Sequence, residues 1–310
     1  MILRCALWFL AIFAVYNLAT LGMERWLAAR SNSFFWSDPA FYKPGIEMRA
    51  QKGLYGDIDG RDVIVGSSLT EILPADLLGP SFEKMNFIGG CPLTGLQIIQ
   101  RAGRHPRRIF IESNYALARY KDDKTLANVF DPCLYRLRRI FPSLRSLNRP
   151  SNVFLLALLP LLKAEPQADA QTRRLDLMNL PVKEDDYPMD EAHIRAALDL
   201  WLPEFGYFGK DEGAVKRVVD PFCKLVGELE KRGIVVCFYE MPMHAEVNAC
   251  KGYRLLQERL HEKYPSSRYL WVHPDPNFNY HTLDGFHLAD MSARAYAQHL
   301  VRQVEQAFPR

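Results

Sequence analysis

Short apolar runs recur along most of this chain, each bounded by polar or glycine-containing segments. The run RDVIVG at Arg61–Gly66 is typical of a buried strand that stops at a turn. Four similar runs predict further strands, at Phe82–Ile88, Arg107–Glu112, Ile234–Tyr239 and Arg268–Val272. The sequence therefore predicts a five-stranded sheet.

Stretches with a helical spacing of apolar residues fill the intervals between these runs. Gly79-Pro80 and Gly233 mark the ends of two of them, and Pro92 lies in the first turn of another. Strands separated by helices of this length pair in parallel through right-handed crossovers. We therefore expect a three-layer α/β/α domain over residues 61–310, with a mostly parallel sheet and with helices at Leu69–Leu78, Pro92–Ala102, Glu212–Arg232, Tyr253–Tyr264 and Met291–Phe308.

The alternation is interrupted at about 114–210, which predicts a helical insertion in this domain. Its most apolar part, Asn152–Leu162, contains a proline and is too short to span a bilayer. We interpret it as a buried helix, with a membrane-facing patch as the alternative. The polar stretch Lys163–Tyr187 predicts a surface loop.

The N-terminus differs in kind, because Cys5–Gly22 contains no charged residue. A membrane-spanning helix needs about 20 mostly apolar residues, so residues 1–30 predict an uncleaved signal anchor. Cleavage after Ala28-Ala29 is the alternative, and both predict an exported, periplasmic or extracytoplasmic domain. Ser31–Gly60, irregular and punctuated by glycine and proline, is interpreted as a stalk at 31–60.

The composition bears on whether the protein binds nucleic acid, an anionic surface or zinc. Of 310 residues, 39 are basic and 36 acidic, and the net charge of +3 gives no reason to expect a nucleic-acid partner. The clusters Arg104–Arg108 and Arg136–Arg139 are interpreted as solvated faces or loop ends, with binding of an anionic surface as the alternative. An odd number of cysteines lies outside the N-terminal segment, and no CxxC pair indicates zinc.

Polar and glycine residues follow the predicted strands, at the edge where sites form in open parallel sheets. A serine, glycine amides, an amide side chain and an Asp-x-x-His pair are what acyl transfer through a serine nucleophile requires. The residues that follow the predicted strands, among which this set occurs, are Ser67, Ser68, Gly89, Gly90, Cys91, Ser113, Asn114, Glu240, His244, His281, Asp284 and His287.

Asp284 and His287 are spaced so that the carboxylate can hold one imidazole nitrogen while the other nitrogen faces a serine. Three other interpretations remain open. Asp284 can cap the last helix; Ser68, with Glu71 three residues later, matches a capping box; and His281, Asp284 and His287 can ligate a metal. Cys91 is interpreted as a packed or bridged residue, and Glu240 and His244 as parts of the pocket rim or of a loop network.

The order of the motifs IVGSSLTEI, NFIGGCP, ESN and DGFHL resembles the SGNH (GDSL-type) hydrolase superfamily over roughly Asp62–Phe308. That resemblance implies Ser68 as nucleophile, Asp284 and His287 as the rest of a Ser-His-Asp triad, and an oxyanion hole formed by the Ser68 amide, Gly89 or Gly90, and Asn114. Ser67 stands where the family has aspartate, and ESN lacks the usual Gly-x-Asn-Asp form.

Membrane-anchored members of the superfamily, such as those of teichoic-acid D-alanylation and alginate O-acetylation, also depart from the name-giving motif. The resemblance to this branch implies O-acyl transfer, of acetyl type, to a cell-envelope polysaccharide, with a possible membrane acyl-donor protein as partner. Ester hydrolysis is the alternative within the same chemistry, and a non-catalytic scaffold of a glycan-modifying complex is the alternative from another class. No cofactor and no metal are expected.

Overall fold

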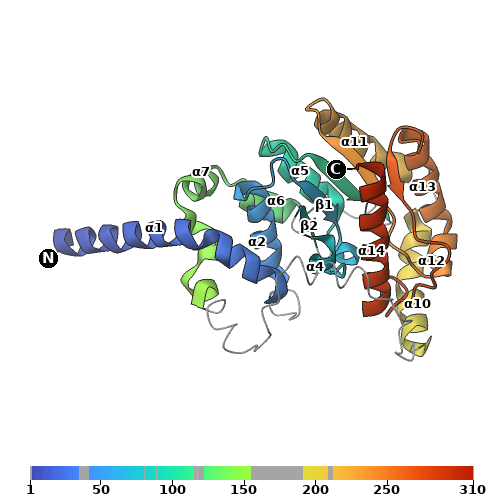
Figure 1. Cartoon of the computed structure of the whole chain (residues 1–310), viewed down its shortest axis with the longest axis horizontal. Helices are drawn as coiled ribbons and strands as arrows, with labels where there is room; N and C mark the ends of the chain where they lie inside the picture. Colours follow the sequence, from blue (N-terminus) through green and yellow to red (C-terminus); the bar gives the residue numbers. More distant parts are fainter. Residues whose placement is uncertain are drawn as a thin grey trace. The chain divides into compact units, whose positions relative to one another are not determined.

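The computed structural model describes residues 2–34, 42–79, 81–87, 90–114, 117, 122–154, 191–208 and 212–309 (Figure 1). By its contacts the chain divides into two compact units. Unit 1 consists of Met1–Asp57 and Asp123–Gln167, and unit 2 of Ile58–Asp122 and Ala168–Arg310. Residues 123–167, which the sequence assigns to an insertion in the sheet domain, are grouped with the N-terminal helix.

Unit 2 contains a five-stranded sheet in the order β2-β1-β3-β4-β5. All of its strand pairs are parallel, which confirms the predicted α/β class and a parallel sheet. The predicted strands are found within about a residue or two of their expected ends. They are β1 (Asp62–Gly66), β2 (Phe82–Asn86), β3 (Arg108–Glu112), β4 (Val235–Tyr239) and β5 (Leu270–Val272).

The strand order reverses at β1, which lies between β2 and β3. In open parallel sheets, the chain leaves the two strands beside such a reversal in opposite directions and opens a crevice at their carboxyl ends. Ser68 follows β1 and Asn114 follows β3. Two of the predicted site residues therefore lie at the reversal point.

Each face of the sheet is apolar, and a different helix packs against each one. Ile64 and Phe110 belong to a buried cluster with Tyr296 of α14 (Asp290–Ala307). On the opposite face, a Cβ added to Gly95 of α5 (Pro92–Arg101) would lie 2.6 Å from a methyl group of Val65. Successive strand residues alternate between the faces, so these apolar runs are buried on both sides.

The remaining helices of unit 2 cover the sheet and its edges. The helix α11 (Glu212–Glu230) contacts β4 and α5, and α13 (Lys251–Lys263) contacts α10 (Glu191–Phe208), α11 and α12 (Ala245–Ala249). The helices α11 and α13 agree with the predicted stretches, α10 lies within the predicted helical insertion, and α12 was not predicted.

The predicted helix Leu69–Leu78 is wrong as one element. Pro74 divides it into α3 (Ser68–Glu71) and α4 (Ala75–Leu78), because proline lacks the N–H that a continuous helix needs and its ring clashes with the preceding turn. A short α3 leaves Ser68 at a helix start directly after β1.

Unit 1 is helical. It contains α1 (Ile2–Phe34), α2 (Tyr42–Tyr55), α6 (Asp123–Val129), α7 (Pro132–Ile140) and the 3-10 turns η3 (Pro142–Leu144) and η4 (Ser146–Asn148). The interpretation of residues 31–60 as irregular is therefore wrong for α2, whose apolar residues Met48 and Leu54 are buried. Only the first residues of the apolar stretch Asn152–Leu162 lie in the described part, and the loop at Lys163–Tyr187 lies outside it.

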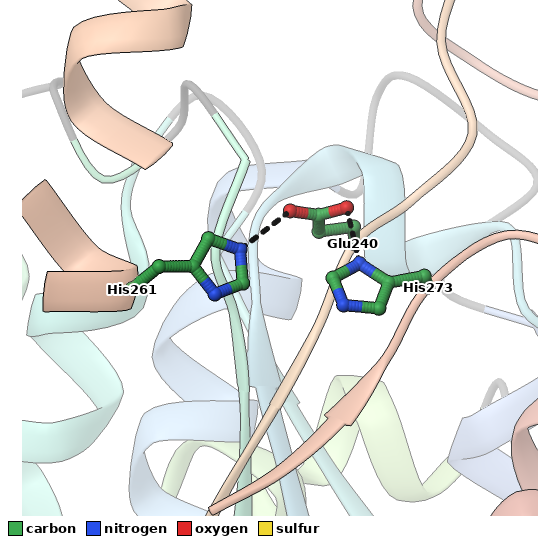
Figure 2. Close-up of side chains that lie close together, drawn as sticks. All are labelled: Glu240, His261 and His273. Carbon is green, nitrogen blue, oxygen red and sulfur yellow. Dashed lines mark hydrogen bonds and ion pairs between the residues drawn. The ribbon is translucent and has the colours of Figure 1, made fainter. Parts of the chain in front are cut away.

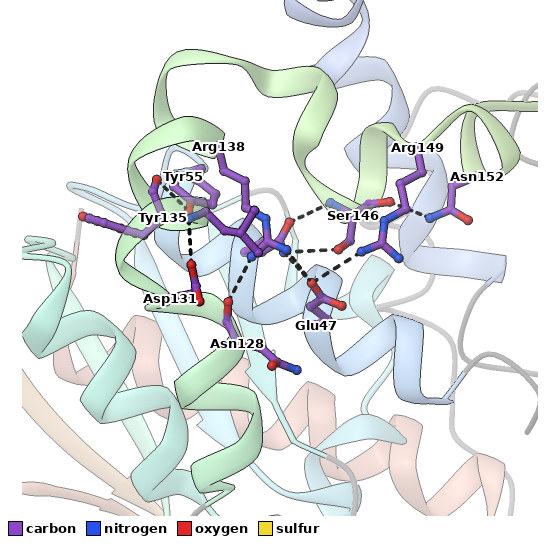
Figure 3. Close-up of polar contacts among 11 residues, drawn as sticks. Glu47, Tyr55, Asn128, Asp131, Tyr135, Arg138, Ser146, Arg149 and Asn152 are labelled. Atoms are coloured by element: carbon purple, nitrogen blue, oxygen red, sulfur yellow. Dashed lines mark hydrogen bonds and ion pairs between the residues drawn. The ribbon is translucent and has the colours of Figure 1, made fainter.

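Buried ion pairs correct the solvated-face interpretation for one arginine of each cluster, Arg108 and Arg138, whereas Arg107, Arg136 and Arg139 are exposed as predicted. In unit 1, Arg138 of α7 is 6% exposed and lies 3.2 Å from the Glu47 carboxylate of α2, which also faces Arg149 (Figure 3). In unit 2, Arg108 donates two hydrogen bonds to Asp62. These arginines fix elements to one another because a buried charge requires a partner.

The N-terminal helix is long and apolar enough over Ile2–Met23 to cross a membrane. One stripe of it packs within unit 1: Phe13 lies against Phe141, with ring centroids 5.3 Å apart, and the Tyr16 hydroxyl donates to the Asn148 carbonyl at 2.6 Å. Asn17 is buried on the same stripe and accepts a hydrogen bond from the Ser143 N–H at 3.2 Å. The opposite side is exposed and apolar, as lipid contact requires.

Candidate active site

The turn after β1 presents Ser68 without using its hydroxyl as a cap. Ser67 is the N-cap of α3, and its hydroxyl accepts a hydrogen bond from the Leu69 N–H at 3.2 Å. The capping-box interpretation of Ser68 with Glu71 is therefore wrong, and the Glu71 carboxylate instead accepts a hydrogen bond from the Asn86 amide. As the first residue of the helix, Ser68 keeps its backbone N–H among those that no helical carbonyl accepts.

The buried carboxylate of Glu112, the last residue of β3, accepts hydrogen bonds from this turn. One oxygen accepts from the Ser67 hydroxyl at 2.7 Å, and the other accepts from the Ser67 N–H at 2.8 Å and from the Thr70 hydroxyl at 2.5 Å. The Thr70 hydroxyl also bonds to the Tyr239 hydroxyl of β4. Burial raises the pKa of Glu112, and the hydrogen bonds from Ser67 and Thr70 act against that rise.

Gly66 is required at the end of β1 by close packing. A Cβ at this position would lie 1.8 Å from the Thr70 hydroxyl oxygen and 2.7 Å from a Glu112 carboxylate oxygen. Any other side chain would displace both groups. Glycine here therefore belongs to the Glu112 network, in addition to ending the strand.

A closed loop carries the second part of the site. Thr282 and Leu288 form an antiparallel bridge, and the Leu283 N–H donates to the His287 carbonyl at 2.7 Å. Gly285 has a φ of +84°, and a Cβ there would lie 2.7 Å from Leu198 of α10, so this turn needs glycine on both counts.

Within this loop Asp284 organises the chain and the imidazole together. Its Oδ1 accepts the N–H groups of Phe286 at 3.0 Å and His287 at 2.7 Å, which closes the turn. Its Oδ2 lies 2.7 Å from Nδ1 of His287. Burial raises the pKa of Asp284, but the hydrogen bonds from His287 and Phe286 and the electrostatic interaction with the imidazole outweigh burial and hold the net pKa below its usual value.

The imidazole of His287 connects the loop to the turn after β1. Its Nε2 lies 3.0 Å from the Ser68 hydroxyl oxygen. Because an ionised carboxylate only accepts hydrogen bonds, Nδ1 of the neutral ring carries the proton and Nε2 is left to accept one from Ser68. The structure thus brings together Ser68, His287 and Asp284 in the order that a nucleophile, a base and an orienting carboxylate require.

The predicted oxyanion donors differ in their hydrogen-bond partners. Asn114 is buried, and its side chain spans the Met241 backbone, donating to the carbonyl at 2.9 Å and accepting from the N–H at 2.6 Å. The Gly90 N–H donates to the Phe87 carbonyl at 3.0 Å, and Gly89 lies outside the described residues. The donor roles of these three residues stay predictions.

Comparisons with known proteins add no assignment to this geometry. No family model matches the sequence, and no curated protein is significantly similar to it. The case for a function therefore depends on the residues themselves.

Three other residues that the sequence indicated as candidates have partners other than Ser68, Asp284 and His287. Burial raises the pKa of Cys91 to about 11, so its sulfur is a packed thiol, and all six cysteines of the chain are free. The ring of His244 caps α12, accepting the Glu246 N–H at 3.3 Å. The ring of His281 lies beside Asn279, and among the described residues His281, Asp284 and His287 do not form a group of ligand atoms close enough to hold one metal ion.

Two groups of residues were missed by the sequence. Glu112 looked like the ordinary end of a strand, although a carboxylate within the apolar run RRIFIE is a signal that it has buried partners. The second group is His261 and His273, which lie beside the predicted rim residue Glu240, and the ligand atoms of these three residues all lie within 4.8 Å of one another (Figure 2). The Glu240 carboxylate raises the pKa of His273, while burial lowers that of His261.

Proposed function

We propose that this protein carries out serine-dependent acyl-ester chemistry, with Ser68 as the nucleophile, His287 as the general base and Asp284 as the orienting carboxylate. The observation that carries this proposal is the 3.0 Å separation between the Ser68 hydroxyl oxygen and Nε2 of a His287 ring that Asp284 holds by its other nitrogen. Nucleophile and base within hydrogen-bond reach, and the base oriented by a third group, are what this chemistry requires.

In the proposed reaction, His287 takes the proton of Ser68 as its oxygen attacks the ester carbonyl. The tetrahedral intermediate collapses when His287 protonates the leaving alcohol, which leaves an acyl group on Ser68. An acceptor hydroxyl, activated by the same imidazole, then takes the acyl group. Asp284 keeps the proton on Nδ1 and stabilises the imidazolium that forms in each step.

The oxyanion of the intermediate needs N–H donors. The Ser68 N–H, which begins α3, is one candidate, and Gly89 or Gly90 and Asn114 are the others. The Asn114 amide donates one hydrogen to the Met241 carbonyl, and its side chain also hydrogen-bonds to Tyr253, so a donor role for Asn114 requires the oxyanion to replace the Tyr253 contact. Removing one such donor typically lowers the rate about 100-fold to 1000-fold.

The reaction we favour is O-acyl transfer, of acetyl type, to a cell-envelope polysaccharide. The apolar helix at Ile2–Met23 supports a membrane-anchored protein with an exported catalytic domain, and Ser67 in place of aspartate supports the membrane-anchored branch of the SGNH superfamily. A three-layer SGNH-like arrangement and a membrane acyl-donor partner belong to the same proposal. Ester hydrolysis uses the same three residues with water as acceptor.

A fluorophosphonate probe tests whether Ser68 is a nucleophile. The full-length protein in detergent should be labelled at Ser68, and Ser68→Ala should abolish labelling. Ser113→Ala is the matched control, because Ser113 is buried and follows β3. Absence of labelling in correctly folded protein would contradict the enzyme proposal and favour a non-catalytic scaffold of a glycan-modifying complex.

A second assay separates transfer from hydrolysis. The protein is incubated with a chromogenic acetyl ester, with and without a soluble glycan acceptor, and both free acetate and acetylated glycan are measured. Transfer predicts acetylated glycan that increases with acceptor concentration. Free acid as the sole product at every acceptor concentration would favour hydrolysis.

A further inference from the structure

Glu240 and His273 are adjacent because the parallel register of β4 and β5 continues past the last ladder pair. Phe238 lies opposite Trp271 and Tyr239 opposite Val272, so the next pair in the series is Glu240 and His273. The Glu240 N–H donates to the Val272 carbonyl at 3.0 Å, which fixes this step of the backbone. Both side chains point to the face that carries Phe238 and Trp271, since strand residues two apart share a face.

The helix α13 brings a third group to the same place. The ring of His261 stacks on Trp271, with centroids 3.9 Å apart, and this contact fixes the plane of the imidazole. Its Nε2 lies 3.8 Å from one Glu240 oxygen, while Nδ1 of His273 lies 2.9 Å from the other. Figure 2 shows the carboxylate between the two rings, each presenting a nitrogen to it.

Within the described residues, the Glu240 carboxylate has its ion-pair and hydrogen-bond partners in these two imidazoles and has no arginine or lysine partner. One carboxylate and two imidazole nitrogens therefore converge within 4.8 Å. Ligand atoms of a tetrahedral zinc ion lie about 3.3 Å apart, given bonds of about 2.0–2.1 Å, so small side-chain rotations bring the three groups to that spacing.

We propose that Glu240, His261 and His273 bind one divalent transition-metal ion of the zinc class. Imidazole nitrogen suits zinc, cobalt, nickel and copper, whereas calcium and magnesium prefer oxygen ligands alone. His273 is half-exposed, so a water molecule can complete the coordination from the solvent side. The ion would join α13 to the carboxyl ends of β4 and β5.

The site is separate from the proposed acyl-transfer residues. Ser68 follows β1, whereas Glu240 and His273 follow β4 and β5, and β3 lies between these strands in the sheet. The metal proposal therefore does not depend on the proposed function. The competing explanation is a carboxylate–imidazole hydrogen bond between Glu240 and His273 that binds no metal.

Cobalt titration of the full-length protein in detergent tests the proposal. Reduced, metal-free protein should bind one Co²⁺ with the visible absorption of a tetrahedral complex and without thiolate charge-transfer bands, and Zn²⁺ should displace it. Zinc at about 100 times its Kd should raise the thermal midpoint by about 5 °C or more. Absence of saturable binding would overturn the proposal and leave the hydrogen-bonded pair.

The variants locate the ion. His261→Gln, His273→Gln and Glu240→Gln should each reduce affinity at least about 10-fold, which matches the effect of losing parts of metal sites. His105→Ala, which removes a histidine before β3, should bind as the wild type does. Thermal midpoints of the metal-free variants show that they fold. Unchanged affinity in His261→Gln and His273→Gln, or loss of binding in His287→Ala alone, would also overturn the assignment.

Discussion

The Ser67 hydroxyl donates to one oxygen of the Glu112 carboxylate at 2.7 Å, while the Ser67 N–H donates to the other at 2.8 Å. Two strands thereby fix the turn that presents Ser68, since Ser67 follows β1 and Glu112 ends β3. We regard Glu112 as a positioning residue, which acts through Ser67 on the geometry of its neighbour.

Replacing Glu112 by glutamine should destabilise unit 2 by about 1–3 kcal/mol, because an amide nitrogen would face a donor that the carboxylate now accepts. The measurement is denaturant unfolding of the full-length protein. Labelling of Ser68 by a fluorophosphonate probe should also slow, since the turn loses its support. Equal stability and equal labelling rates in the two proteins would contradict a positioning role.

The same variant gives a pH prediction. Burial raises the pKa of Glu112 in the folded protein, so between the unfolded and folded pKa values the folded state binds more protons. Stability contributed by Glu112 is therefore complete below the unfolded pKa and is lost as pH rises through the folded pKa. The stability difference between wild type and Glu112→Gln should decrease as pH rises above about 4.5. A difference that grows with pH would contradict the raised pKa.

Placing an aspartate at position 67, where the superfamily that the sequence resembles has one, should destabilise this protein. Ser67→Asp places a second carboxylate against the buried one of Glu112 and should cost about 3 kcal/mol or more. Ser67→Ala should cost less, because it removes hydrogen bonds without adding charge. The double variant Ser67→Asp/Glu112→Ser should recover stability relative to Ser67→Asp, and additive losses in this cycle would refute direct contact.

Gly66→Ala should be severely destabilising, by about 2 kcal/mol or more, because its Cβ would overlap the Thr70 hydroxyl at 1.8 Å. Gly227→Ala is the matched control: it lies within α11 with no atom within 4 Å of an added Cβ. That change should be neutral or stabilising by up to about 1 kcal/mol, because alanine favours helix. Thermal unfolding of both variants checks the pair.

Asp284→Asn should lower kcat for acyl-ester turnover by about 10,000-fold, since an amide no longer fixes the His287 tautomer. Its side-chain oxygen can still accept the Phe286 and His287 N–H groups, so unfolding should change little. Ester turnover and thermal unfolding of the same preparation separate the two effects. A loss of both together would indicate that Asp284 serves the loop and not the imidazole.

Most of the sheet was predictable, because its inner strands β1, β3 and β4 carry apolar residues on both faces and all five strands are separated by helical spacing and turn residues. The grouping of Ser68, Asp284 and His287 was also predicted, from motif order and strand ends. Local pattern could not assign the cap of α3, because adjacent serines are equivalent until Glu112 distinguishes them.

The features that the sequence did not predict depend on residues far apart in the chain. The apolar character of α2 is weak, and burial of Arg138 is visible only once Glu47 lies beside it. Likewise, His261 and His273 look like ordinary polar positions until the register of β4 and β5 and the placement of α13 are known.

The hydrogen bond between Tyr16 and Asn148 joins positions 132 residues apart. During synthesis, the buried stripe of α1 therefore lacks its contacts with η3 and η4 until the ribosome has also produced β1, β2 and β3, which lie between the two halves of unit 1 in the sequence. Asn17 must remain without its Ser143 partner throughout that interval. The order of translation thus makes completion of the N-terminal unit a late step, although its first helix is made first.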